Sequence, residues 1–121
     1  MKRYFLFAIL VFFITVCAFA QEIGRVEVGR NMFVVFAQNG SRISSTNIGT
    51  GSHTLIGWGN DFFVVRNGDS LYSHDSRGRR IAEYSPGVSI ARALVYQETV
   101  IVFSGEGNAS VVLSRDLRRI Q

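Results

Sequence analysis

The stretch that decides the fold is Phe62-Phe63-Val64-Val65-Arg66-Asn67-Gly68-Asp69. Its first four residues are apolar without interruption, which is typical of a strand buried on both faces, whereas alternation is typical of a strand with one solvated face. The Asn-Gly pair that follows is a strong signal for a hairpin turn. The sequence therefore predicts an antiparallel unit with this strand inside it.

Two further apolar runs have the same form, at Met32–Phe36 and Val100–Phe103, and each is followed by a turn that contains glycine. The runs recur after 30 and then 37 residues, counted between Val34, Val64 and Ile101. Such a spacing lies in the range of repeat architectures. The sequence therefore predicts two to three related units.

Turn residues divide the central unit into four short strands, expected at 53–58, 62–66, 70–74 and 79–84. The flanking strands are expected at 23–28, 32–38 and 41–46 on one side and at 90–96, 99–103, 109–115 and 117–120 on the other. No segment has an apolar stripe of helical period over 11 or more residues. We predict an all-β domain over residues 21–121 with two to three antiparallel four-stranded meanders. A compact β-sandwich or barrel is the alternative.

The central unit carries a family resemblance. Its sequence Leu71-Tyr72-Ser73-His74-Asp75-Ser76-Arg77-Gly78-Arg79-Arg80-Ile81 resembles the third strand, Asp-x-x-Gly turn and fourth strand of a β-propeller blade of the Trp-Asp-repeat or quinoprotein-like kind. Asp75 is expected to cap the turn and Gly78 to adopt a positive φ. The resemblance is clearest over residues 53–84 and implies blade-like sheets. The chain has no Trp-Asp dipeptide and fewer than three full units, against 4 to 8 blades in typical propellers, so the resemblance implies no functional residues.

The first 20 residues have the three-part form of a secretory signal peptide. Lys2 and Arg3 make the positive region, Tyr4–Val16 is almost continuously apolar, and Ala18-Phe19-Ala20 is a small-x-small cleavage site. Retention as a membrane anchor is the alternative, since the apolar stretch of 17 residues to Ala20 is at the lower limit for spanning a bilayer. We expect cleavage, export to a bacterial periplasm or the extracellular space, and no membrane span afterwards.

Removing this segment changes the composition of the chain. The only cysteine, Cys17, is lost, so the remaining 101 residues must fold without a disulfide. Losing Lys2 and Arg3 leaves 11 of the 13 basic residues, all of them arginine, against 9 acidic ones. The net charge falls from +4 to +2. This balance predicts no nucleic-acid partner.

His53 and His74 are the only imidazoles. A hydrolase could be built from Ser52, His53 and an aspartate, but the chain has no Gly-x-Ser-x-Gly elbow to support it. Two histidines without metal-ligand spacing do not indicate a metal site. The Gly57-Trp58-Gly59 and Gly105-Glu106-Gly107 pairs open no expected helix, which a dinucleotide site requires. We expect both histidines to be polar residues at strand ends, and no catalytic, metal or cofactor site.

Two groups of side chains are candidate binding residues. Aromatic rings on an exported β-protein can stack on sugars, although such rings also pack between sheets; the candidates are Trp58, Tyr72, Tyr84 and Tyr96. Arginines around the central turn could contact an anionic partner, or they could protect an exposed strand edge from pairing; they are Arg77, Arg79 and Arg80.

The apolar runs also bear on partners, because outer units of an open array would each leave an apolar face or an unpaired edge. We expect self-association or a protein partner, with a closed monomer as the alternative. The sequence as a whole predicts a small exported, non-catalytic β-repeat protein that acts as a binding or structural module. A carbohydrate-binding, lectin-like module and a hydrolase are the alternative functions.

Overall fold

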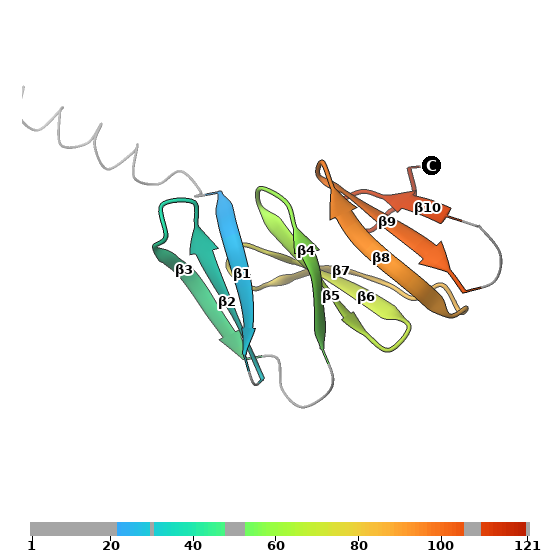
Figure 1. The fold of residues 1–121 in the computed structure, drawn as a ribbon, viewed down its shortest axis with the longest axis horizontal. Helices are drawn as coiled ribbons and strands as arrows, with labels where there is room; N and C mark the ends of the chain where they lie inside the picture. Colours follow the sequence, from blue (N-terminus) through green and yellow to red (C-terminus); the bar gives the residue numbers. More distant parts are fainter. Residues whose placement is uncertain (1–21, 30, 48–52, 106–109, 121) are drawn as a thin grey trace, which may run out of the picture.

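Each of the three apolar runs forms the second strand of its own antiparallel sheet (Figure 1). The computed structural model describes residues 22–29, 31–47, 53–105 and 110–120. The first sheet contains β1 (Ile23–Gly29), β2 (Met32–Ala37) and β3 (Arg42–Asn47). The central sheet contains β4 (Thr54–Trp58), β5 (Phe62–Asn67), β6 (Ser70–Asp75) and β7 (Arg80–Tyr84). The last sheet contains β8 (Ile90–Tyr96), β9 (Thr99–Ser104) and β10 (Ser110–Leu113). The prediction of an all-β chain of antiparallel meanders is confirmed.

Strand order follows chain order in all three sheets, so each is a simple meander. Within the described ranges no strand pairs with a strand of another sheet, and the barrel alternative is therefore wrong. Among the described residues, four strands occur in the central sheet only. The fourth strand predicted at 117–120 is reduced to an isolated bridge between Leu113 and Arg119, supported by a hydrogen bond of 2.8 Å from the Ile120 amide to the Val112 carbonyl.

The central sheet is covered on both faces. Successive side chains of a strand point to opposite faces, and in β5 this directs Phe62 and Val64 toward the last sheet and Phe63 and Val65 toward the first. All four side chains are fully buried. The first strands of neighbouring sheets also lie against each other, β1 with β4 and β4 with β8. The prediction of a strand buried on both faces is thus confirmed for this run.

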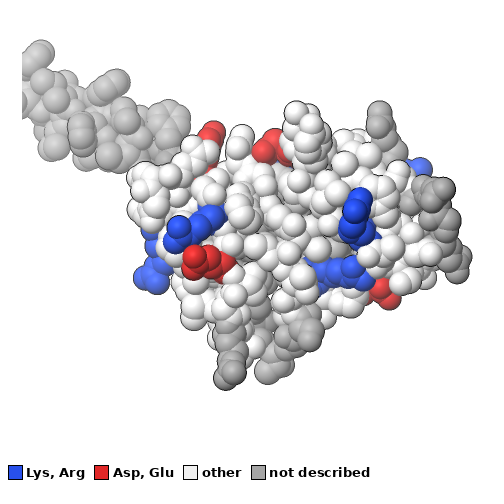
Figure 2. All heavy atoms as spheres, viewed as in Figure 1, with Lys and Arg blue, Asp and Glu red and all other residues white. Residues whose placement is uncertain are grey.

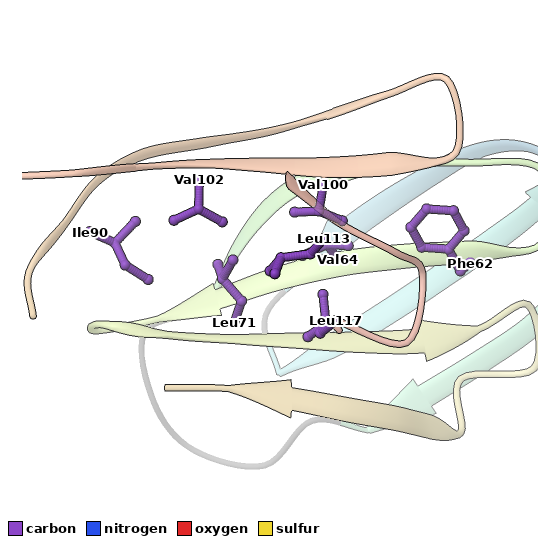
Figure 3. Packing of buried hydrophobic residues seen from close by; sticks show 8 residues of the cluster. All are labelled: Phe62, Val64, Leu71, Ile90, Val100, Val102, Leu113 and Leu117. Carbon is purple, nitrogen blue, oxygen red and sulfur yellow. The ribbon is translucent and has the colours of Figure 1, made fainter. Parts of the chain in front are cut away.

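Figure 3 shows the larger apolar cluster, which fills the space between the central and last sheets. Its buried members are Phe62, Val64, Leu71, Ile90, Val100, Val102, Leu113 and Leu117. They come from both sheets and from the segment that follows β10. Burying one large apolar side chain contributes roughly 1.5 to 3 kcal/mol, so this cluster is a main source of the stability of the fold. A smaller cluster between the first and central sheets contains Ile23, Val26, Phe33, Val35, Phe63 and Val65.

The apolar runs of the two end sheets are buried on one face only, contrary to the sequence prediction. In β2 and β9 alternate residues face the central sheet, while Phe36 and Phe103 lie on outer faces and are partly exposed. An arginine guanidinium covers each of these rings. Arg25 lies 4.1 Å from the ring centroid of Phe36, and Arg92 lies 4.9 Å from that of Phe103. The end sheets therefore shield their outer apolar side chains with cation–π contacts.

Candidate functional site

The turn between β6 and β7 joins the central sheet to the first sheet. Asp75 Oδ1 accepts hydrogen bonds of 2.9 Å from the backbone amides of Arg77 and Arg79. Gly78 has a φ of 85°, so the predicted Asp-x-x-Gly turn has the expected geometry. The turn also packs on β3, where the Ser44 hydroxyl donates a hydrogen bond of 2.7 Å to the carbonyl of Ser76. This contact fixes one wall of a pocket.

The pocket lies where the first and central sheets meet and has a volume of about 240 Å³. We call it the seam pocket. Residues of both sheets and of the turn line it: Phe33, Thr46, Asn47, His53, Tyr72, His74, Gly78 and Arg80. No aspartate or glutamate is among these lining residues. The lining is therefore polar, and Arg80 gives it a positive charge that no acidic lining residue balances.

Strand register brings three of the polar groups together. Tyr72 and His74 are two residues apart on β6 and point to the same face, toward the first sheet. Arg80 is directly opposite His74 on β7, and its guanidinium lies 4.4 Å from the ring centroid of Tyr72. His53 directly precedes β4 and also lines the pocket.

Both histidines pack against phenylalanine rings. The His74 ring stacks on Phe63 with centroids 5.0 Å apart, and the rings of His74 and Phe33 are 5.8 Å apart. His53 meets Phe33 edge-on at 6.2 Å. The Nδ1 atoms of both histidines are buried and have no hydrogen-bond partner within the described protein. Each histidine thus has one apolar face and one polar atom without a partner.

The electrostatic environment keeps His74 uncharged. The pKa of His74 is lowered from the ordinary value of 6.5 to about 4; burial is the largest cause, and the positive charge of Arg80 is the second. The charge of Asp75 acts in the opposite direction, while His53 has a smaller lowering effect. At neutral pH the His74 imidazole can therefore donate or accept a hydrogen bond but carries no charge.

The four candidate aromatic residues do not form one surface. Tyr72 lines the seam pocket, and Tyr84 packs on the larger apolar cluster. Trp58 and Tyr96 are 39% and 59% exposed. Trp58 pairs with Phe63 and lies on the face of the central sheet that turns toward the first sheet, whereas Tyr96 pairs with Thr99 on the outer face of the last sheet. These two exposed rings therefore cannot form a common stacking platform.

The three candidate arginines are also separated by the fold. Arg77 and Arg79 are exposed in the turn, and only Arg80 enters the seam pocket. On the face drawn in Figure 2, basic side chains occur in separate groups divided by neutral surface. The predicted cluster of anion contacts is thus reduced, within the pocket, to one arginine.

The catalytic alternative finds no matching geometry among the described residues. Ser73 is buried on the face of β6 opposite to His74, and the Asp75 carboxylate is engaged by the backbone of its own turn. Ser52 lies outside the described residues. In the described ranges no three His, Cys, Asp or Glu residues are grouped in a way that could hold a metal ion.

A second, apolar pocket of about 180 Å³ lies between the central and last sheets. Its lining is Tyr84, Pro86, Val88, Ser89, Ile90, Val102, Ser104 and Val111. It contains no ionisable group other than the phenol of Tyr84, so it offers little means of selecting a ligand by charge.

Sequence reasoning placed both histidines at strand ends but did not bring them together. Phe33 and Thr46 of the first sheet were not recognised as site residues at all. One local signal was available, because Tyr72 and His74 share a face of the predicted strand opposite a basic segment. The pocket residues of the first sheet could not be predicted from the sequence, because their position depends on how two sheets pack against each other.

The predicted signal peptide, residues 1–20, lies outside the described residues. Among those that are described, there is no helix with the length and apolarity needed to cross a membrane. Compared with known proteins, the chain matches no protein-family model, no curated protein and no solved structure.

Proposed function

We propose that this chain is a small exported protein in which blade-like β-sheets form a non-catalytic binding module, with the seam pocket as its ligand site. The observation that carries the proposal is the pocket itself, a concave space of about 240 Å³ with convergent polar groups at the junction of two sheets. Pockets of this kind are where small ligands bind in proteins. Its size is below the roughly 300 to 1,000 Å³ of drug-sized sites, which favours a small metabolite.

The surroundings of the histidines favour binding over catalysis. A general base works best with a pKa near the working pH, whereas the pKa of His74 is lowered to about 4. Its ring is stacked on Phe63, and the neighbouring carboxylate of Asp75 stabilises a turn. These features suit a fixed wall of a binding site.

Two further parts of the proposal rest on sequence and sheet arrangement. Export is supported by the three-part form of residues 1–20. Mass spectrometry of the protein from its native host tests this, and an N-terminus at Gln21 is expected; an intact Met1 or a lipid on Cys17 would contradict it. Likeness to propeller blades is supported by three meanders whose first strands, β1, β4 and β8, adjoin one another.

A panel of small polar compounds, including neutral sugars, tests the binding function. NMR resonances of the two imidazoles report on the pocket, and we expect at least one compound to shift them saturably. His74→Phe should weaken this binding, while Tyr96→Ser, which changes an exposed ring outside the pocket, should not. If no compound shifts either imidazole, the seam pocket is not a ligand site. Sugar binding that is lost in Tyr96→Ser but kept in His74→Phe would favour the lectin-like alternative.

A further inference from the structure

The polar lining of the seam pocket includes basic side chains. Arg80, His53 and His74 line it, and no carboxylate does. The nearest acids along the chain are Asp75, whose Oδ1 accepts two backbone amides of its own turn, and Glu83, which does not line the pocket and accepts a hydrogen bond from the Ser85 hydroxyl. Arg80 forms no ion pair with any carboxylate in the described ranges. The Arg80 side chain is exposed at the edge of the pocket and is not paired with any described acid, so its N–H groups are available to a negatively charged ligand that enters the pocket.

The position of Arg80 suits this role. Its guanidinium lies over the ring of Tyr72, with 4.4 Å from Cζ to the ring centroid. A guanidinium that stacks by its flat face keeps its N–H groups available at its edge. Those N–H groups can form two parallel hydrogen bonds to one carboxylate or phosphate. The stacking also restricts the side chain in advance, which reduces the entropy lost when a ligand binds.

The histidines supply the remaining donors. Nδ1 of His53 and Nδ1 of His74 are both buried without a hydrogen-bond partner in the described protein. A neutral imidazole can carry its proton on either nitrogen, so each ring can present one N–H donor to an anion in the pocket. Each imidazole is held in place by a phenylalanine, His53 by Phe33 and His74 by Phe63.

Resting on the proposed binding function, we infer that the ligand of the seam pocket is a small organic anion, held through a carboxylate or phosphate group by Arg80 with His53 and His74 as additional donors. The volume of about 240 Å³ corresponds to roughly eight water molecules at ~30 Å³ each. This is enough for a compound the size of a monosaccharide or a three-carbon phosphate.

The test uses pairs of probes that differ in charge. Protein produced from the full-length chain is titrated with glucuronate and glucose, and with glycerol 3-phosphate and glycerol, while the two imidazoles are followed by NMR. We expect saturable shifts with the two anions and none with the two neutral partners at the same concentrations. Inorganic phosphate and acetate show whether the anionic group alone suffices. A preference for glucuronate or for glycerol 3-phosphate identifies the carboxylate or the phosphate as the recognised group.

Arg80→Gln removes the cation that lines the pocket, and Arg79→Gln is its matched control because Arg79 is exposed like Arg80 but does not line the pocket. We expect Arg80→Gln to weaken anion binding roughly ten- to a hundredfold, the effect of losing a charged hydrogen-bonding group. Arg79→Gln should change it less than twofold. Arg80→Lys, which keeps the charge but not the planar pair of donors, should fall between wild type and Arg80→Gln. Intermediate binding by Arg80→Lys would show that the loss in Arg80→Gln comes from the missing guanidinium and not from misfolding.

Each adverse outcome has a separate meaning. Neutral probes that bind as tightly as the anions would overturn the inference and leave the binding function standing. Equal losses in Arg79→Gln and Arg80→Gln would also overturn it, since they would indicate attraction to surface charge in general. No shift of the imidazoles with any probe or panel compound would overturn both the inference and the binding function.

Discussion

Stability should fall in weak acid because of one residue, His74. Its pKa is about 4 in the folded protein, against 6.5 in the ordinary case. Between these two values the unfolded chain binds a proton at this site and the folded protein does not, so acid favours unfolding. The contribution of His74 to stability is therefore complete above about pH 6.5 and is lost as the pH falls toward 4.

The size of the effect follows from the two pKa values. Linkage gives a decrease of about 2 kcal/mol in the free energy of unfolding between pH 7.5 and pH 5.0. His74 is only partly buried, and solvent screening reduces such effects, so we expect about 1 kcal/mol. Urea denaturation followed by the fluorescence of Trp58, the only tryptophan, can measure this. With the slopes usual for small domains, the shift in midpoint is roughly 0.3 to 1 M urea.

The variant His74→Phe isolates the contribution of the imidazole. A phenyl ring can keep the contacts with Phe63 and Phe33 but binds no proton. Because the other titrating groups are the same in both proteins, the free energy of unfolding should fall by about 1 kcal/mol less in the variant than in wild type between pH 7.5 and 5.0. Arg80→Gln, which removes a second cause of the lowered pKa, should reduce the acid sensitivity in part. If wild type and His74→Phe lose equal stability, the assignment of the acid sensitivity to His74 is refuted.

Three further predictions concern the sheets and their turns. Gly78→Ala should destabilise the fold by roughly 1 to 3 kcal/mol in urea denaturation, because a Cβ at this positive φ would clash with the Thr46 side chain; an unchanged midpoint would contradict the tight contact. Gln97→Asn should raise the melting temperature by about 1 to 3 °C, because Gln97 has a φ of 48° that asparagine adopts more readily; a lower temperature would contradict it. The double change Arg25→Ser and Arg92→Ser should increase self-association in light scattering, because it exposes the outer phenylalanines. Wild-type protein that is already dimeric at micromolar concentration would instead indicate that a second copy covers these faces.

Strand positions could be predicted because their signals are local. A β-branched or aromatic run followed by Asn-Gly or a similar pair marks a strand and its end without reference to the rest of the chain. For the same reason the Asp75 turn was predicted with its glycine conformation. The missing fourth strand of the last sheet shows the limit of such signals. Residues 117–120 have strand-like composition but form only one bridge, at Arg119.

The burial of the outer runs could not be predicted, because it depends on whether another sheet lies beyond them. Phe62–Val65 and Val100–Phe103 look alike in sequence. The first is enclosed between two sheets, whereas the second has a covered face and an outer face on which Arg92 packs. The candidate site shares this dependence. Phe33 is 20 residues from His53 and 41 from His74, and only the packing of the first sheet on the central sheet brings the three rings together.

The location of the seam pocket follows from the two faces of β6. Leu71 and Ser73 turn toward the last sheet and are fully buried, because the larger apolar cluster closes over that face. Tyr72 and His74 turn toward the first sheet and are only partly buried. Phe63 and Val65 of β5 are fully buried against the first sheet, whereas side chains on the same face of β6 and β7, the two strands farther from β4, are only partly buried or are exposed. Polar side chains on those outer strands then remain accessible beside an aromatic interior, which is the combination that a small-ligand site requires.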